Sequence, residues 1–310
     1  MDRRLLLAAA LGAALAPRPA RADGPVPHTT SVHLQPGGQR ILLGSDSGLL
    51  ISDDGGASFH WVCGEAYGVS NLYQPKHAVT ASGEMYATTP DGLRLSRDGG
   101  CTWELLGEPV GQGTTVVTVG PDGRVWAAST AQHRPNDVYR SVDGAAFEST
   151  GLSAEGVWWL SVLTTSDPGR VYASGTRLPV GETPGEALLR RSDDGGDTWQ
   201  ELPVDPFAFG GSTPYLFLLG VAPADPDLLF ARAAGVAQGG DAVYRSTDGG
   251  QSWAHVLDMG GPVDGFVVRE DGATVVVGSR YPCRGEAGSG QGCVRISQDV
   301  GQSYRPAELQ

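Results

Sequence analysis

Ser192-Asp193-Asp194-Gly195-Gly196-Asp197-Thr198-Trp199 is one copy of an eight-residue pattern, S-x-D-G-G-x-T-W, that returns along the chain. Full copies also begin at Ser52, Ser96 and Ser246. A weaker copy, S-Q-D-V-G-Q-S-Y, begins at Ser297, and a copy that is one residue short, S-V-D-G-A-A-F, begins at Ser141. The six serines lie 44, 45, 51, 54 and 51 residues apart. A pattern that recurs at such a period is the sequence signature of a repeat architecture.

The residue types of this pattern are typical of a tight turn between two strands. Aspartate bonds back to nearby backbone amides, and glycine adopts a positive φ without a Cβ clash. The serine hydroxyl can bond locally at the end of one strand, and the aromatic residue begins the next strand with a large apolar side chain. The positions to which we assign this structural role are Ser52, Asp54, Gly56, Phe59, Ser96, Asp98, Gly100, Trp103, Ser141, Asp143, Ser192, Asp194, Gly196, Trp199, Ser246, Asp248, Gly250, Trp253, Ser297, Asp299, Gly301 and Tyr304.

A cation bound by these aspartates is the alternative interpretation, because carboxylates are the ligands that Ca²⁺ prefers. A turn whose aspartate is satisfied by its own backbone needs no ion, however. No H-E-x-x-H or paired C-x-x-C spacing is present either. We therefore predict neither a metal site nor a cofactor.

The pattern resembles the Asp-box, or BNR repeat, of sialidases, sortilin-type receptors, some glucanases and photosystem II assembly factors. Four of the six copies match it in full, and together the six span most of the chain. Proteins with this repeat are β-propellers, so the resemblance implies that fold. In that family the box is structural and lies away from the active face, so the resemblance implies no particular activity.

Each repeat contains four strand-like runs. In the fourth repeat these are residues 158–164, 170–174, 187–192 and 198–202, with a turn at 166–169. Such runs and turn signals at this spacing indicate an all-β fold. Six groups of four predict a six-bladed β-propeller of four-stranded antiparallel blades, in a single domain over residues 23–310. A seven-bladed ring is the alternative, and it would need a further blade that residues 23–30 and those after Pro306 are too few to supply.

The first 22 residues predict a secretory signal peptide. Arg3-Arg4 precedes an apolar run over residues 5–16, and Ala20-Arg21-Ala22 offers a cleavage site before Asp23. We therefore expect a periplasmic or extracellular protein with no transmembrane segment in the mature chain. Arg3-Arg4 leaves both the general secretory and the twin-arginine route open.

The charge of the chain excludes one class of partner. The formal net charge is −13, and it becomes −16 when residues 1–22, with four arginines and one aspartate, are removed. Such a charge repels phosphate backbones, so we exclude nucleic acid as a partner. Lys76 is the only lysine, a bias that we attribute to a GC-rich bacterial genome.

Export permits disulfide bonds, and four cysteines are present. Cys283 and Cys293 bracket a Gly-rich loop between two strand-like runs, and we predict that they are joined. Cys63 lies late in one strand, whereas Cys101 lies in the turn of the next repeat. Because a strand rises about 3.3 Å per residue, these two cysteines are too far apart in height to bond with each other.

The predicted topology separates two ends of the ring. The boxes share one end with the short first-to-second turns, and the other end carries the long connections over residues 64–77, 129–137, 175–186, 203–214, 233–241 and 279–292. Binding residues are usually held on variable loops, so we predict the binding face at this loop-rich end. Its candidate residues are Tyr67, Tyr73, His77, Trp158, Trp159, Phe207, Phe209, Tyr215, Asp264 and Tyr281. The alternative for Trp158 and Trp159 is that one of them packs between blades.

The first hypothesis for function is a non-catalytic scaffold that binds a protein or a carbohydrate as a monomer. Asp167-Pro168, Val171-Tyr172-Ala173 and then the box resemble the repeats of assembly-factor propellers, which offer a docking surface. A module of a larger cell-surface assembly is a structural variant of this hypothesis. The alternative is a sialidase-like exo-glycoside hydrolase, which the resemblance would equip with three arginines, a Tyr–Glu pair and an acidic Asp. Gln39-Arg40-Ile41-Leu42 departs from the F/Y-R-I-P motif of that family, and Asp264 has no evident carboxylate partner in the sequence.

Overall fold

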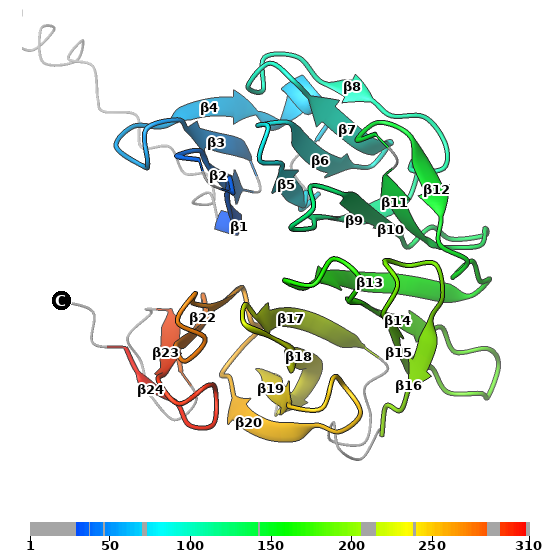
Figure 1. Cartoon of the computed structure of the whole chain (residues 1–310), viewed down its shortest axis with the longest axis vertical. Coiled ribbons are helices and arrows are strands. Elements are labelled where there is room, and N and C mark those ends of the chain that lie inside the picture. Colours follow the sequence, from blue (N-terminus) through cyan, green and yellow to red (C-terminus); the bar gives the residue numbers. More distant parts are fainter. Residues whose placement is uncertain are drawn as a thin grey trace, which may run out of the picture.

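The structure is a computed structural model, described for residues 29–36, 38–45, 47–69, 73–141, 143–205, 215–237, 240–283 and 292–307. Its strands form six four-stranded antiparallel sheets, each made of four consecutive strands. Figure 1 shows these sheets as blades arranged around a common axis. The predicted six-bladed propeller is therefore confirmed, and the described residues contain no seventh blade.

The first three blades occupy the N-terminal half of the chain. Blade one comprises β1 (Thr29–Leu34), β2 (Ile41–Ser45), β3 (Gly48–Ser52) and β4 (His60–Cys63), and the short 3-10 helix η1 (Gly64–Tyr67) follows it. Blade two comprises β5 (His77–Val79), β6 (Met85–Thr89), β7 (Gly92–Ser96) and β8 (Glu104–Leu105). Blade three comprises β9 (Thr114–Val119), β10 (Val125–Ser129), β11 (Val138–Ser141) and β12 (Phe147–Ser149).

The other three blades complete the ring. Blade four comprises β13 (Val157–Thr164), β14 (Val171–Arg177), β15 (Glu186–Ser192) and β16 (Gln200–Leu202). Blade five comprises β17 (Leu216–Ala222), β18 (Asp225–Ala237), β19 (Gly240–Ser246) and β20 (Ala254–Asp258). Blade six comprises β21 (Gly265–Val268), β22 (Val275–Ser279), β23 (Cys293–Ser297) and β24 (Arg305–Pro306).

Blade five departs from the predicted loops. Residues 233–241 were expected to form a long connection, but β18 continues to Ala237 and pairs there with Gly240. Ala233 and Ala242 also pair and are buried. Continuing the ladder gives partners to backbone groups that would otherwise be buried without hydrogen bonds.

The core lies between the faces of neighbouring blades. Apolar side chains alternate along β22, where Val275 and Val277 are buried and Val276 is half-buried. Among the described residues, buried apolar side chains gather in five clusters, which join blades one and two, two and three, three and four, four and five, and five and six. Each blade thus completes its core only with a neighbour, as in other repeat proteins.

The full boxes are turns closed by their own side chains. In the fourth box, Ser192 Oγ donates to Asp194 Oδ1 at 2.8 Å and accepts from Gly196 N at 2.8 Å. Asp194 also accepts from Thr198 N and Thr198 Oγ1, at 2.8 and 2.6 Å. These hydrogen bonds lower the pKa of Asp194 to about 2. The boxes that begin at Ser52, Ser96, Ser246 and Ser297 repeat this arrangement.

The third box is different because it is one residue short. Asp143 accepts hydrogen bonds from the backbone of Ala145 and Ala146, at 3.0 and 2.7 Å. Ser141 Oγ accepts instead from Val125 N of the neighbouring strand β10, at 2.8 Å. The shorter turn therefore keeps a bonded aspartate but joins its serine to the sheet.

Boxes also connect a blade to the blade before it, with hydrogen bonds at two junctions. Arg140 Nη1 of blade three donates to Gly195 O in the box of blade four, at 2.7 Å. Arg245 of blade five donates in the same way to Val300 O of blade six, at 2.8 Å. The second box glycine lies against the preceding blade, since a Cβ at Gly196 would come within 2.7 Å of the Trp126 ring. A small residue at this position lets two blades approach closely.

Candidate functional site

The first connection of the loop-rich end is packed rather than open. Tyr67 and His77 are both fully buried, with ring centroids 5.9 Å apart, and Tyr67 also lies 5.1 Å from Trp103. Burial raises the pKa of Tyr67. The structure thus places these two predicted binding-face residues in the core between blades one and two, where a ligand cannot reach them.

The other predicted aromatic residues are placed variously. Trp159 is buried and donates through Nε1 to Leu152 O at 3.2 Å, whereas Trp158, its neighbour on β13, is half-buried. Successive residues of a strand point to opposite faces, which accounts for the difference. Tyr73 and Tyr215 are half-buried. Phe207 and Phe209 lie outside the described residues.

A charged set is instead found at one height on three blades. In blade two the box serine, Ser96, pairs with Met85, and Thr88 lies three residues further along the same strand. Thr88 N donates a hydrogen bond to Lys76 O, which fixes the height of Lys76. In blade five the partner of the box serine is Leu229, and Arg232 lies three residues beyond it. In blade six the partner of the box serine is Val275, and Gly278 lies three residues beyond it. Asp264 N donates a hydrogen bond to Gly278 O. At about 3.3 Å per residue, all three groups lie about 10 Å from the box end, toward the loops.

These charges influence one another. Lys76 has an exposed side chain, yet enough protein surrounds it to lower its pKa. The charge of Arg232 lowers the pKa of Lys76 further, and the charge of Asp264 raises it. The charged groups of Lys76, Arg232 and Asp264, from blades two, five and six, therefore lie near enough for their charges to act on one another.

The partners of this set hold it in place. Arg232 Nη1 forms an ion pair with the buried Asp241, and its guanidinium lies 4.3 Å from the centre of the Phe217 ring. Asp264 forms an ion pair with Arg280 at 2.8 Å, which contributes to lowering the pKa of Asp264. Lys76 forms no ion pair with any described residue, so its charge is available to a ligand.

Two histidines near Lys76 lie in the junction of blades one and two. His33 pairs with Leu42 and His77 with Ala87, and both partners belong to the cluster that joins these blades. Burial lowers the pKa of His77 to about 3 and that of His33 to about 4, and the charge of Lys76 adds to both shifts. Both histidines are therefore neutral at pH 7.

Sequence analysis named His77, Asp264 and Tyr281 in this region and missed Lys76, Arg232, Arg280 and His33. The sequence did contain one feature that sets Lys76 apart, because it is the only lysine of the chain. Arg232 and Arg280 could not be found, since arginine is common and only the ring brings these residues together.

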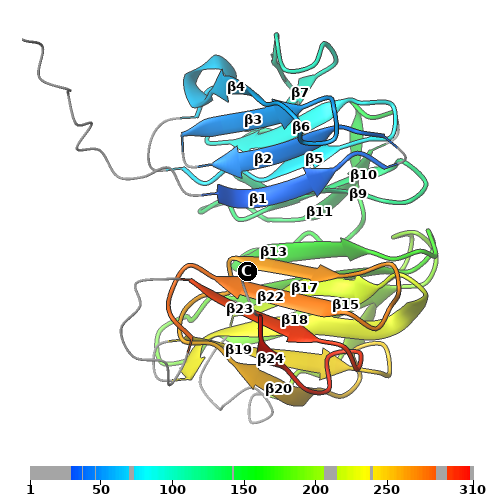
Figure 2. The ribbon, with the colours of Figure 1, turned by 90° about the vertical axis from the view of Figure 1, so that its left-hand side faces the viewer.

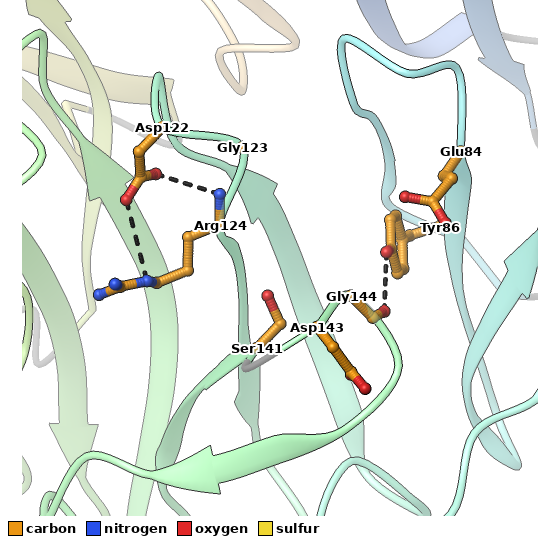
Figure 3. A pocket seen from close by; sticks show the side chains of 8 residues that line it. All are labelled: Glu84, Tyr86, Asp122, Gly123, Arg124, Ser141, Asp143 and Gly144. Carbon is orange, nitrogen blue, oxygen red and sulfur yellow. Dashed lines mark hydrogen bonds and ion pairs between the residues drawn. The ribbon is translucent and has the colours of Figure 1, made fainter.

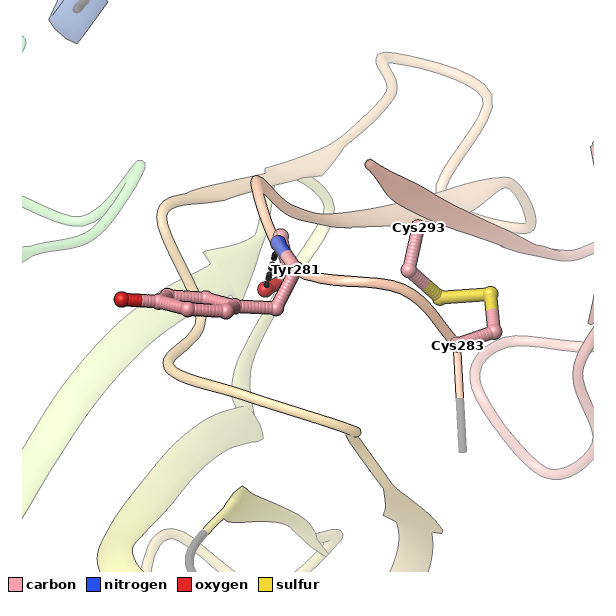
Figure 4. The surroundings of a disulfide bond; sticks show 4 residues. Tyr281, Cys283 and Cys293 are labelled. Carbon is pink, nitrogen blue, oxygen red and sulfur yellow. Dashed lines mark hydrogen bonds between the residues drawn. A yellow bond between two sulfur atoms is a disulfide. The ribbon is translucent and has the colours of Figure 1, made fainter. Parts of the chain in front are cut away.

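The disulfide predicted between Cys283 and Cys293 is confirmed (Figure 4). Tyr281 lies just before it and is exposed, and its side chain points away from the bond. A Cβ at Gly261 would come within 2.6 Å of Tyr281, so the absence of a side chain at Gly261 leaves room for the tyrosine side chain. Cys63 and Cys101 are free thiols. The disulfide thus anchors β23 to the segment that carries Arg280 and Tyr281.

A cavity of about 320 Å³ lies at the opposite end of the ring, beside the short third box (Figure 3). Its polar side chains already have partners: Asp122 with Arg124, Glu84 with Arg97, and Asp143 with its own turn. Tyr86 Oη crosses it to donate to Gly144 O at 2.7 Å. The cavity therefore offers no unpaired charge to a ligand.

The described part of the chain holds neither a metal-binding cluster nor a membrane-spanning helix. No three His, Cys, Asp or Glu side chains come together in an arrangement that could hold a metal ion. No helix in that part is long and apolar enough to cross a membrane. Two arginines of the described part, Arg232 and Arg280, lie in the charged set, each with an aspartate partner.

Comparison with known proteins supports the fold. The family model of the BNR/Asp-box repeat matches residues 244–255, and no curated protein matches the chain. YCF48 bound to D1 peptide is 18% identical, with a TM-score of 0.51 over 84% of this chain and 79% of that chain. An ancestral GH74 enzyme is 17% identical, with a TM-score of 0.60 over 86% and 36% of the two chains. A GH74 xyloglucanase from Xanthomonas campestris is 17% identical, with a TM-score of 0.47 over 86% and 50%.

The chain spans half the length of that xyloglucanase and about a third of the ancestral enzyme. At identities this low, the likenesses with TM-scores of 0.51 and 0.60 show a shared fold alone. Together with the six boxes and the six sheets, they lead to one conclusion. The chain carries Asp-box (BNR) repeats and folds as a six-bladed β-propeller.

Proposed function

We propose that this protein is a non-catalytic scaffold that binds a protein or a carbohydrate at the loop-rich end of its ring. The observation that carries the proposal is the convergence of Lys76, Arg232 and Asp264 at one height on three blades. Because Lys76 is exposed and forms no ion pair with another described residue, it suits an acceptor group on a ligand. Tyr281 and Trp158 add partly apolar surface of the kind that peptides and sugars use.

The rest of the ring suits this role by being rigid. The boxes and the inter-blade hydrogen bonds fix the height of each strand, and therefore the positions of the charged groups. Preorganised groups lose less freedom when a ligand binds. YCF48, which has this fold, is known in complex with a D1 peptide, and a protein ligand for the present chain is consistent with that example.

The proposal is tested with variants of the charged set. A glycan array and a pull-down from the native envelope identify the ligand, and its Kd is then measured for the parent and for Lys76→Ala. A hydrogen bond to a charged group contributes about 1.5–3 kcal/mol, so we expect Kd to rise about tenfold or more. The matched control is Arg97→Ala, which removes an exposed cation at the box end and should leave Kd unchanged. An equal loss in both variants, or no ligand in either screen, would refute the proposal.

The same proposal places the protein outside the cytoplasm as a monomer, with residues 1–22 removed on export. The disulfide supports this location, because structural disulfides persist in oxidising compartments. Mass spectrometry of the protein from its native host should give a mature chain that begins at Asp23. A chain that retains residues 1–22 would contradict the proposed export.

A further inference from the structure

The guanidinium of Arg232 is held on one edge and on one face. Its Nη1 forms an ion pair with Oδ2 of Asp241, whose side chain is only 5% exposed. The same carboxylate oxygen accepts a hydrogen bond from Val263 N at 2.9 Å, which fixes the carboxylate in turn. The guanidinium carbon lies 4.3 Å from the centre of the ring of Phe217, the cross-strand partner of Arg232. The orientation of the guanidinium is thus set before any ligand arrives.

The other edge of this guanidinium remains available. An arginine has five N–H donors in a planar arrangement. Among the described residues, Asp241 accepts from Nη1 of Arg232, and no residue accepts from its Nε or Nη2. These two nitrogens present parallel N–H groups, a fork that matches the two oxygens of a carboxylate. Arg232 therefore offers a preorganised pair of donors.

Lys76 supplies a second cation near this fork. The charge of Arg232 acts on Lys76 of blade two and on Asp264 of blade six, so the charged groups of three blades lie near one another. In the side view of Figure 2 the strands of the blades run in roughly the same direction, so equal residue numbers from the boxes correspond to similar heights. Lys76 is exposed and forms no ion pair with another described residue. A cation without an ion pair thus lies within electrostatic reach of the fork.

The charge balance favours a ligand group with a single negative charge. Lys76, Arg232 and Arg280 contribute three positive charges, and Asp241 and Asp264 contribute two negative ones, which leaves one positive charge in excess. The chain as a whole is acidic, with a formal net charge of −13. A phosphate group, with nearly two negative charges, would meet more repulsion from this chain than a carboxylate with one.

We propose that the charged set binds a carboxylate of the ligand, with the two carboxylate oxygens on Nε and Nη2 of Arg232 and with Lys76 beside them. This inference rests on the proposed function, which leaves the chemistry of the ligand group open, and it makes Arg232 a residue that determines specificity. Asp241 and Phe217 act through Arg232, because they hold the fork in place. An acidic side chain of a protein and an acidic sugar both present this group.

The single lysine makes the test direct. A chain labelled isotopically at the lysine Cε atom gives one such NMR signal, because Lys76 is the only lysine. The probes are a glutamate blocked at both backbone ends, with the equivalent blocked glutamine, and glucuronate, with glucose, all at constant ionic strength. We expect a saturable shift of the signal with a carboxylate and none with its neutral counterpart. The carboxylate that binds more tightly identifies the source of the ligand group.

Arg232→Lys tests the fork itself. It keeps a positive charge opposite the buried Asp241, and therefore the fold, but a lysine lacks the planar pair of donors. We expect carboxylate binding to weaken about tenfold or more, as for the loss of a hydrogen bond between charged groups. The matched control is Arg177→Lys, the same substitution at an exposed arginine that ends β14 of blade four and pairs with Glu186. It should leave the response unchanged.

Several results would overturn the inference. Equal shifts with the carboxylates and their neutral counterparts, or no saturable shift with either carboxylate, would remove the carboxylate as the ligand group. Tighter binding of inorganic phosphate would assign the charged set to a different anion. Binding that is unchanged in Arg232→Lys would leave the fork without a role.

These outcomes are distinct from a failure of the proposed function. A macromolecular ligand could show a raised Kd in Lys76→Ala and yet bind equally well after its carboxylates are converted to amides. That result would support the proposed function and overturn this inference. Carboxylate binding by the labelled chain, with no ligand in the glycan array or the pull-down, would support this inference and refute the proposed function.

Discussion

At the scale of single residues, the box that begins at Ser297 contains a strained position. Val300 stands where the full copies have glycine, and its φ is 62°. A β-branched residue is disfavoured there, because the left-handed conformation brings its Cβ close to the carbonyl oxygen. The hydrogen bonds of this box are nevertheless complete, so the turn tolerates the strain.

Val300→Gly is therefore expected to raise the free energy of unfolding by about 1 kcal/mol, because it relieves a conformational cost of about 1–2 kcal/mol per residue. The matched control is Gly55→Val, at the equivalent position of the first box, where φ is 72° and a Cβ would meet nothing. That variant should lose about 1–2 kcal/mol. Urea denaturation measures both, and a destabilised Val300→Gly would show that valine packing outweighs the strain.

The buried His77 and the half-buried His33 predict a pH dependence. Their pKa values, about 4 for His33 and about 3 for His77, lie below the value of 6.5 that they have when unfolded. The unfolded chain therefore binds protons first, and stability that is complete above pH 6.5 is lost as pH falls toward 4. At pH 4 we expect a loss on the order of 3 kcal/mol for His77, from about 1.4 kcal/mol per pKa unit.

Denaturant titrations between pH 7 and pH 4 check this expectation, with His33→Leu/His77→Leu as the comparison. The double variant should show a much smaller dependence in this window. The box aspartates titrate separately: the pKa of Asp54 is about 2, so their contribution is lost only below pH 3.8. An unchanged pH dependence in the double variant would assign it to other groups.

At the scale of elements, the disulfide links the start of β23 to the segment that ends at Cys283. Cys283 and Cys293 are separated by 10 residues, and both are buried against blade five. A cross-link over a loop of this length restricts the unfolded chain. It also ties the segment with Arg280 to the sheet of blade six.

Cys283→Ser/Cys293→Ser should lower the free energy of unfolding by about 2–3 kcal/mol. Reductant should lower the Tm of the parent to that of the variant. Cys101→Ser is the control, since Cys101 is an exposed free thiol and should change little. A parent whose Tm is insensitive to reductant would mean that the cross-link adds no stability.

At the scale of the whole molecule, the stability of each blade depends on the blades that pack against it. The apolar clusters of the described residues pack blades two to five on both faces and blades one and six on one face each. In a repeat architecture the stability of a unit depends on its interfaces with the adjacent units. The ends of the series should therefore open more readily than its middle.

Hydrogen exchange should show this order. Amides of β2 in blade one and β22 in blade six are expected to exchange faster than those of β10 and β14 in blades three and four. All four are second strands of their sheets, so the comparison is matched in position. Uniform protection in all four would mean that blades one and six are supported as well as the others.

The sequence by itself determined what is local. Each box closes through bonds between residues no more than four apart, so Ser192, Asp194 and Thr198 specify the turn wherever it stands. Four strand-like runs per box then predict six blades, and two cysteines around one loop predict their bond. Only the tertiary structure decided that Tyr67 and His77 are buried and that the charges of Arg232 and Asp264 act on Lys76. These relations join blades that are far apart in the chain, and they depend on how the blades pack, which no local pattern encodes.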